Sequence, residues 1–147
     1  MFKKIAISIV IVLSACLLFL YHHLTGPPIV YFVNSSDFVL EEAAITTSGG
    51  DRFLGTVHPG VERCCFVDVR VESGLAISFT AGSQKVFADD LAYLESSMGS
   101  CETVEINSDL SVKSTFRGPG CGFARFARCH LTRRCSGRLT AAAELRR

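Results

Sequence analysis

The sequence predicts a mainly β fold: an immunoglobulin-like antiparallel β-sandwich of seven or eight strands, preceded by one N-terminal transmembrane helix. An uncharged apolar run fills residues 5–20, short segments of period-two hydrophobicity recur between residues 29 and 116, and turn-forming residues separate these segments. The composition changes abruptly after residue 116. We therefore divide the chain into an N-terminal anchor 1–25, a β-sandwich domain 26–117 and a basic tail 118–147.

The N-terminal segment has the composition of a membrane anchor. Lys3 and Lys4 precede sixteen uncharged residues, 5–20, of which eleven are Ile, Leu, Val or Phe. These eleven together favour membrane insertion by roughly 3 to 7 kcal/mol. With residues 21–24 the run reaches the lower end of the length that spans a bilayer. We expect membrane attachment through residues 5–24, with the lysines in the cytoplasm and the domain in the periplasm, as in a single-pass protein of the bacterial inner membrane.

Two other interpretations of this segment stay open. Residues 13–16, Leu-Ser-Ala-Cys, resemble a bacterial lipobox, which would make Cys16 a lipidation site and the protein a lipoprotein. Lipoproteins of that pattern turn polar after the acylated cysteine, whereas residues 17–20 remain apolar, so a spanning anchor is preferred. Cleavage with release is the third interpretation, and no A-x-A-like site supports it.

The expected strands follow in order. Residues 29–33 are apolar throughout, as in a strand covered on both faces. Residues 75–80 and 110–116 alternate between apolar and polar, and residues 65–71 place Cys65 and three valines on one face. The remaining expected strands are 38–47, 52–57, 102–106 and, as an eighth, 84–88. Turn-forming clusters lie at 34–37, 48–51, 58–60, 72–74, 81–83 and 107–109.

This order of elements resembles that of small membrane-anchored periplasmic β-sandwich proteins. An apolar leader, an Asn-containing first turn at 34–37 and the turn Pro59-Gly60 carry the resemblance. It implies the same location and fold for this chain, and it implies no particular activity.

Of the seven cysteines, three lie in the domain. In an oxidising compartment we expect one disulfide among them. Neighbours on a strand point to opposite faces, so only one of Cys64 and Cys65 can meet Cys101. Cys65 shares its face with apolar residues. The predicted pair is therefore Cys65 and Cys101, which leaves Cys64 over.

No combination of residues predicts catalysis or metal binding. The chain has no G-x-S-x-G segment, and its cysteines lack the paired C-x-x-C spacing of zinc sites. His22 and His23 are better explained as interfacial residues than as metal ligands, and His58 as an exposed residue beside a turn than as a base. Asp89, Asp90 and Glu95 are better explained as solvated loop residues than as calcium ligands. We expect a protein that is not an enzyme, with no cofactor and no metal.

The tail differs in charge from the domain. Residues 26–116 carry five basic and thirteen acidic residues, a net −8, whereas residues 117–147 carry eight Arg against Glu144, a net +7. No structural period recurs in the tail, so we expect it to be mostly disordered and dispensable. No nucleic-acid partner is expected, because in this topology the Arg-rich segment faces away from the cytoplasm.

The last twelve residues, 136–147, resemble a translated attC recombination site, the element that ends an integron gene cassette. Glu-Leu-Arg-Arg followed by a stop codon can contain the GTTAG of that element. The resemblance implies a cassette-encoded, mobile bacterial gene. The leading functional hypothesis is a non-enzymatic binding module on the periplasmic side of the membrane, and the alternative is an envelope-level factor for defence or immunity against phage or toxin.

Overall fold

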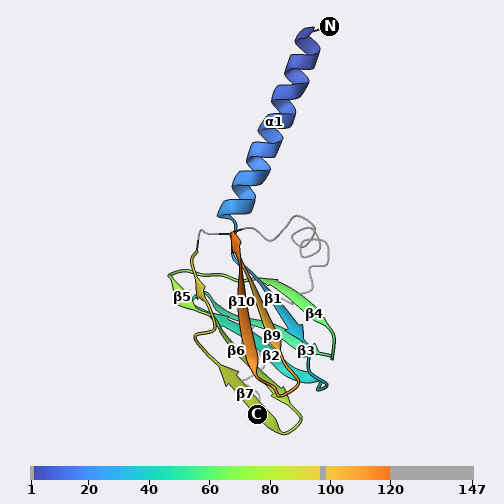
Figure 1. Ribbon diagram of the computed structural model, residues 1–147. Helices are drawn as coiled ribbons and strands as arrows, with labels where there is room; N and C mark the ends of the chain where they lie inside the picture. The colour runs from blue at the N-terminus through green and yellow to red at the C-terminus, as the bar shows by residue number, and fades with distance from the viewer. Residues whose placement is uncertain (1, 97–98, 120–147) are drawn as a thin grey trace, which may run out of the picture.

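The computed structural model of the protein describes residues 2–96 and 99–119 (Figure 1). The expectations for a disordered, dispensable tail and for an attC-derived C-terminus fall almost entirely on residues 120–147, outside the described residues. A helix and ten strands make up the described part of the chain.

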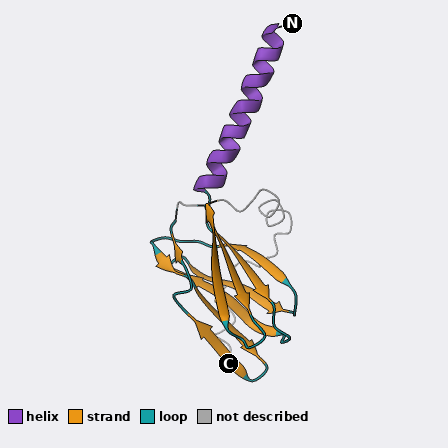
Figure 2. Ribbon diagram, viewed as in Figure 1, coloured by secondary structure: helices purple, strands orange, loops and turns teal. Residues whose placement is uncertain are grey.

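Helix α1 (Phe2–Thr25) projects from one end of the β domain (Figures 1 and 2). The apolar run predicted this helix, and Gly26-Pro27-Pro28 follows its end. The large apolar side chains described between Ile7 and Tyr21 are each at least 50% exposed. Among the described residues, no helix combines the length and the apolarity needed to cross a membrane. The transmembrane span expected over residues 5–24 is therefore not supported.

The mainly β prediction is confirmed. Eight strands form two four-stranded sheets, in the orders β10-β9-β1-β4 and β3-β2-β6-β7, and β5 and β8 form a small third sheet. The strands are β1 (Ile29–Asn34), β2 (Leu40–Thr47), β3 (Gly50–Val57), β4 (Glu62–Phe66), β5 (Ser73–Gly74), β6 (Ala76–Ala81), β7 (Gln84–Ala88), β8 (Tyr93–Leu94), β9 (Ser100–Ile106) and β10 (Val112–Pro119).

The pairing of β1 corrects the expectation of a wholly antiparallel sandwich. β1 lies between β4, to which it is antiparallel, and β9, to which it is parallel. Of the two four-stranded sheets, β3-β2-β6-β7 is the one that is antiparallel throughout. The periodicity of a strand reports which of its faces is buried but not which strand lies beside it, so the parallel pair was not predictable from the pattern.

The strand expected over residues 65–71 is also corrected. β4 covers Glu62–Phe66, and the chain leaves the sheet after Phe66. Val67 and Val69 are nevertheless buried, whereas Val71 is 66% exposed. The alternation of valines thus indicated burial correctly at two of three positions, but these residues reach the core from an irregular segment.

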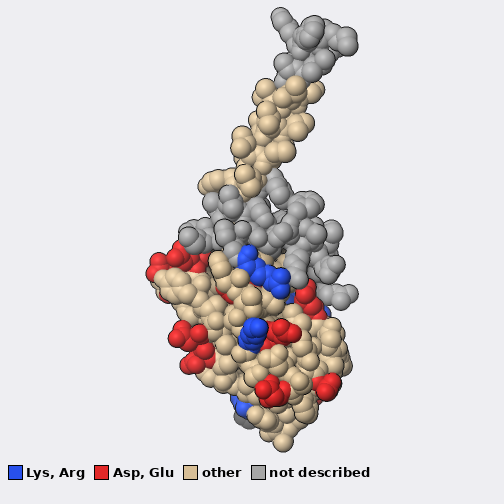
Figure 3. Space-filling model, in the orientation of Figure 1, with Lys and Arg blue, Asp and Glu red and all other residues tan. Residues whose placement is uncertain are grey.

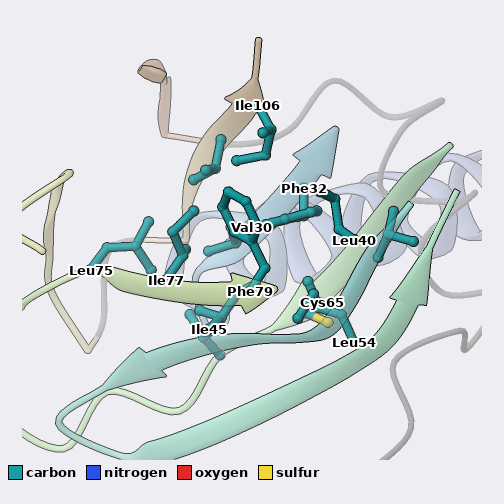
Figure 4. Close-up of a cluster of buried hydrophobic side chains, with 14 of the residues drawn as sticks. Val30, Phe32, Leu40, Ile45, Leu54, Cys65, Leu75, Ile77, Phe79 and Ile106 are labelled. Atoms are coloured by element: carbon teal, nitrogen blue, oxygen red, sulfur yellow. The ribbon is translucent and has the colours of Figure 1, made fainter. Parts of the chain in front are cut away.

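The two four-stranded sheets share one core (Figure 4). Val30 and Phe32 of β1 contribute from one sheet, and Ile45, Ile77 and Phe79 from the other. All five side chains are at most 1% exposed. Burying large apolar side chains contributes roughly 1.5–3 kcal/mol each, so this shared layer is the main source of stability.

Candidate functional site

An acidic side chain lies on the core-facing side of the first sheet. Side chains alternate along a strand, so Glu102 of β9 faces the same side as Val104 and Ile106, which both belong to the shared core. Glu102 is only 2% exposed. A carboxyl group buried to this degree costs free energy of desolvation, so its position calls for an explanation in its partners or its role.

The neighbouring strand β10 supplies a polar partner. Its register places Phe116 opposite Glu102 and Ser114 opposite Val104, so both β10 side chains face the same side of the sheet as Glu102. Ser114 Oγ donates a hydrogen bond of 3.1 Å to Glu102 Oε2. Because β10 is the outermost strand of its sheet, this group of side chains lies near the edge of the domain.

A pocket of about 450 Å³ opens beside Glu102 and Ser114. The side chains around it are one carboxyl group, one hydroxyl group and four apolar or aromatic groups: Leu91, Ala92, Tyr93, Glu102, Ser114 and Phe116. The wall at residues 91–93 is fixed to the core, because Leu75 N donates to Ala92 O at 2.8 Å and Leu91 N donates to Leu75 O at 3.0 Å. Leu75 is itself fully buried.

The environment of Glu102 favours its neutral form. Burial raises the pKa of Glu102 above the ordinary carboxyl value, and the hydrogen bond from Ser114 lowers it by a smaller amount. The carboxyl group can therefore be protonated at a higher pH than an exposed one. A positive charge placed next to it in the pocket would favour the ionised form instead.

Two further acids, Glu72 and Glu95, interact with Tyr93 of the pocket lining. The Tyr93 hydroxyl donates to Glu72 Oε2. This hydrogen bond, then partial burial and the negative charges of Glu72 and Glu95, raise the pKa of Tyr93 to about 12. The ring itself is 59% exposed. The region around the pocket thus combines an exposed aromatic side chain with negative charge, and none of the lining residues is basic.

A second hollow of about 550 Å³ lies on the outer face of the other sheet. Glu42 and Phe53 are among the residues that line it, with Lys85 from β7. Glu42 has a φ of 52° at an irregularity in the pairing of β2, and Gly55 beside it on β3 has a φ of 70°. Every charged side chain of this hollow is exposed, so it lacks the buried ionisable group found in the first pocket.

The three domain cysteines lie in two strands that flank β1. Cys64 and Cys65 are on β4, and Cys101 is on β9. Cys65 belongs to the shared core, whereas Cys101 lies with Ile29 and Tyr31 in a second cluster, against which Cys64 packs. Cys64, Cys65 and Cys101 are all disulfide-bonded, whereas Cys16 is free and exposed.

This placement does not bring the predicted pair together. Cys65 and Cys101 face opposite sides of one sheet, with β1 between their strands. Two strand spacings amount to about 9–10 Å, beyond the Cα separation of about 7 Å that a disulfide tolerates. The inward assignment of Cys65 is confirmed, but the expectation that Cys64 would be left over is wrong because Cys64 is bonded.

The other sequence candidates are not assembled into a site. His58, Asp89 and Asp90 are exposed, and the side chains of His22 and His23 lie outside the described residues. Within residues 2–96 and 99–119, no three His, Cys, Asp or Glu side chains are grouped so that they could hold a metal ion.

The sequence interpretation missed Glu102, although it did predict the strand that carries it. In the segment Glu102-Thr103-Val104-Glu105-Ile106, one face reads Glu, Val, Ile. An acid that continues an apolar face is the pattern that indicates a buried carboxyl group. Residues 91–93 gave no such indication, because they reach the pocket through tertiary contacts with Leu75.

No family model matches this chain, and no curated protein matches it. Among solved structures, the chain is similar to the "NMR structure of the protein from Eubacterium rectale", with 12% sequence identity and a TM-score of 0.42. The match covers 62% of this chain and 88% of the other. None of these comparisons supports an integron origin or indicates a function.

Proposed function

We propose that the protein is a non-enzymatic binding module that holds a small ligand in the pocket beside Glu102. The observation that carries the proposal is a buried carboxyl group at an open, mostly apolar pocket. An apolar side chain at position 102 would complete the face formed by Val104 and Ile106 without the desolvation cost of a carboxyl group. Pockets with apolar walls and a few polar groups are typical small-ligand sites.

The composition of the pocket favours binding over catalysis. Ser114 contacts Glu102, but the lining residues include no histidine or lysine that could act as a base toward the hydroxyl group. A carboxylate alone is a weak base toward a serine hydroxyl group. The pocket's groups are suited to hold and orient a ligand.

We further propose that helix α1 attaches the domain to the bacterial membrane on the periplasmic side. Five consecutive residues, 9–13, expose large apolar side chains, so apolar surface extends around the helix. Moving this surface out of water into an apolar environment is favourable. The disulfide-bonded cysteines of the domain fit an oxidising compartment.

An immunoglobulin-like classification of the domain is likewise a proposal. Two four-stranded sheets around one core support it. The parallel pairing of β1 with β9 differs from the antiparallel sandwich that the sequence predicted.

Ligand binding can be tested on the full chain in uncharged detergent micelles. We expect a fragment library, screened by ¹H–¹⁵N NMR, to yield ligands that shift the resonances of residues 91–93, 102 and 114–116. Ala92→Phe fills this pocket and should abolish those shifts, whereas Thr56→Phe, which fills the hollow on the other sheet, should leave them unchanged. Hits that are lost in Thr56→Phe and kept in Ala92→Phe would show that the wrong site has been proposed.

Location can be tested with C-terminal fusions in a bacterial host. An alkaline phosphatase fusion should be active and sediment with membranes, and a green fluorescent protein fusion should be dark. Deletion of residues 5–20 should abolish both the phosphatase activity and the membrane association. Cys16→Ser should leave attachment intact for an apolar anchor, whereas acyl labelling that disappears in Cys16→Ser would indicate a lipoprotein.

A further inference from the structure

Starting from the proposed function, we infer that the pocket beside Glu102 takes a small organic cation. In this arrangement the ligand's ammonium group lies against the Glu102 carboxylate, and its apolar part contacts Leu91, Ala92 and the aromatic side chains. The inference names a ligand class, and it can fail while ligand binding in the pocket still holds.

The electrostatics around Glu102 favour a cation. Ser114 is the only hydrogen-bond donor to the Glu102 carboxyl group in the described part of the chain, and no basic side chain lines the pocket. Without a ligand the buried Glu102 favours its neutral form, and its carboxylate form is favoured once a positive charge lies beside it. A cation from solution would provide that charge, while an anion would meet both Glu102 and the acids near Tyr93.

The net charge of the β domain has the same sign as the Glu102 carboxylate. Residues 26–116 have a net charge of −8, and Figure 3 shows acidic side chains spread over the visible face of the β domain. A surface of one sign attracts ligands of the opposite sign and raises their local concentration. The domain as a whole therefore favours cations over anions.

The aromatic side chains of the pocket also favour an organic cation. Tyr93 is 59% exposed and Phe116 is 60% exposed, and both line the pocket. The negative face of an aromatic ring attracts organic cations, most strongly those whose charge is spread over alkyl groups. Exposed aromatic rings beside a buried carboxylate form a combination that suits an alkylammonium group.

The size of the pocket suits an organic cation rather than a metal ion. A volume of about 450 Å³ lies within the range of about 300–1,000 Å³ for small-ligand sites and exceeds what a bare metal ion needs. With a single carboxylate in its lining, the pocket also lacks the several oxygen ligands that calcium requires. The geometry thus points to an organic cation of modest size.

The test uses a matched pair of probes, choline and its uncharged isostere 3,3-dimethylbutan-1-ol, titrated into the full chain in uncharged micelles. We expect choline to shift the resonances of residues 91–93, 102 and 114–116 and to bind at least tenfold more tightly than the alcohol. Glu102→Gln should remove this preference, and Glu105→Gln, which changes the same residue type on the other face of β9, should retain it.

The outcomes separate the two proposals. Equal affinity for choline and the alcohol, unchanged in Glu102→Gln, would overturn the cation inference while leaving the pocket as a binding site. Failure of both probes and of every screened fragment to shift the pocket residues would overturn both. If Glu102→Gln does not fold, Phe116→Leu serves instead, and it should weaken choline several-fold with little effect on the alcohol.

Discussion

Asn34, at the end of β1, offers a sharp test of how the polar groups at one end of the core stabilise the fold. Its side chain is fully buried. Asn34 Nδ2 donates to Phe38 O at 2.8 Å and to Val57 O at 2.9 Å, and Asn34 Oδ1 accepts from Ser36 N at 3.1 Å and from Ser36 Oγ at 2.7 Å. Four hydrogen bonds therefore connect β1, the following turn and the end of β3.

Asn34→Ala removes all four bonds. The carbonyl of Val57, a fully buried residue, and the N–H of Ser36 would lose the bond to Asn34, and each unsatisfied buried group costs about 1–3 kcal/mol. Ser36 Oγ keeps its hydrogen bonds with the backbone of Phe38. Phe38 is exposed, so water can replace the bond to its carbonyl. We expect a total loss of about 3–4 kcal/mol, which is a large part of the 5–15 kcal/mol that stabilises a typical domain.

Urea unfolding of the full chain in micelles measures this loss. With a typical slope of about 1–3 kcal/mol per molar urea, the midpoint should fall by about 1–4 M. Asn107→Ala is the matched control: Asn107 donates to Ser111 Oγ in an exposed turn, and its loss should cost less than about 1 kcal/mol. Equal effects of the two substitutions would refute the assignment of Asn34 as a buried, fully satisfied connector.

Two further predictions concern stability. Burial raises the pKa of Glu102, so the stability that its protonated form contributes is present below the ordinary value of 4.5 and is lost as the pH rises through the folded-state pKa. Glu102→Gln should therefore unfold at a higher urea concentration than the wild type at pH 7, and the difference should shrink toward pH 4. A Glu102→Gln variant that is less stable than the wild type at pH 7 would contradict this prediction. A Cβ atom at Gly49 would clash with the backbone carbonyl of Asp68, so Gly49→Ala should lower the free energy of unfolding by several kcal/mol and the urea midpoint with it. Gly74→Ala, whose nearest contact would be 3.5 Å, should change the midpoint little.

The fold shows which parts of a sequence pattern carry over into three dimensions. Each of the eight expected strands has a counterpart, because turn residues and period-two hydrophobicity are local properties of the chain. The parallel neighbour of β1 and the early end of β4 depend on long-range pairing, and no local pattern encodes them. The same limit applies to the cysteines, since Cys65 could be assigned to the core face but Cys101 could not be placed relative to it.

The candidate site was only partly predictable for a related reason. The strand that carries Glu102 was predicted, and the acid on its apolar face could have been noticed in the sequence. Ser114 and Phe116 alternate with outward residues on β10, so their common face could also have been derived. Residues 91–93 form the opposite wall only because Leu75 holds them there, and that contact joins distant parts of the chain.

The most direct test of the central claim is a ¹³C NMR titration of the Glu102 side-chain carboxyl group in the full chain, assigned with Glu102→Gln and measured with and without saturating choline. We expect a midpoint above the ordinary value of 4.5 in the free protein, because the group is buried. With choline we expect a lower midpoint, because a neighbouring positive charge favours the carboxylate. A midpoint at or below 4.5 that choline leaves unchanged would contradict the account.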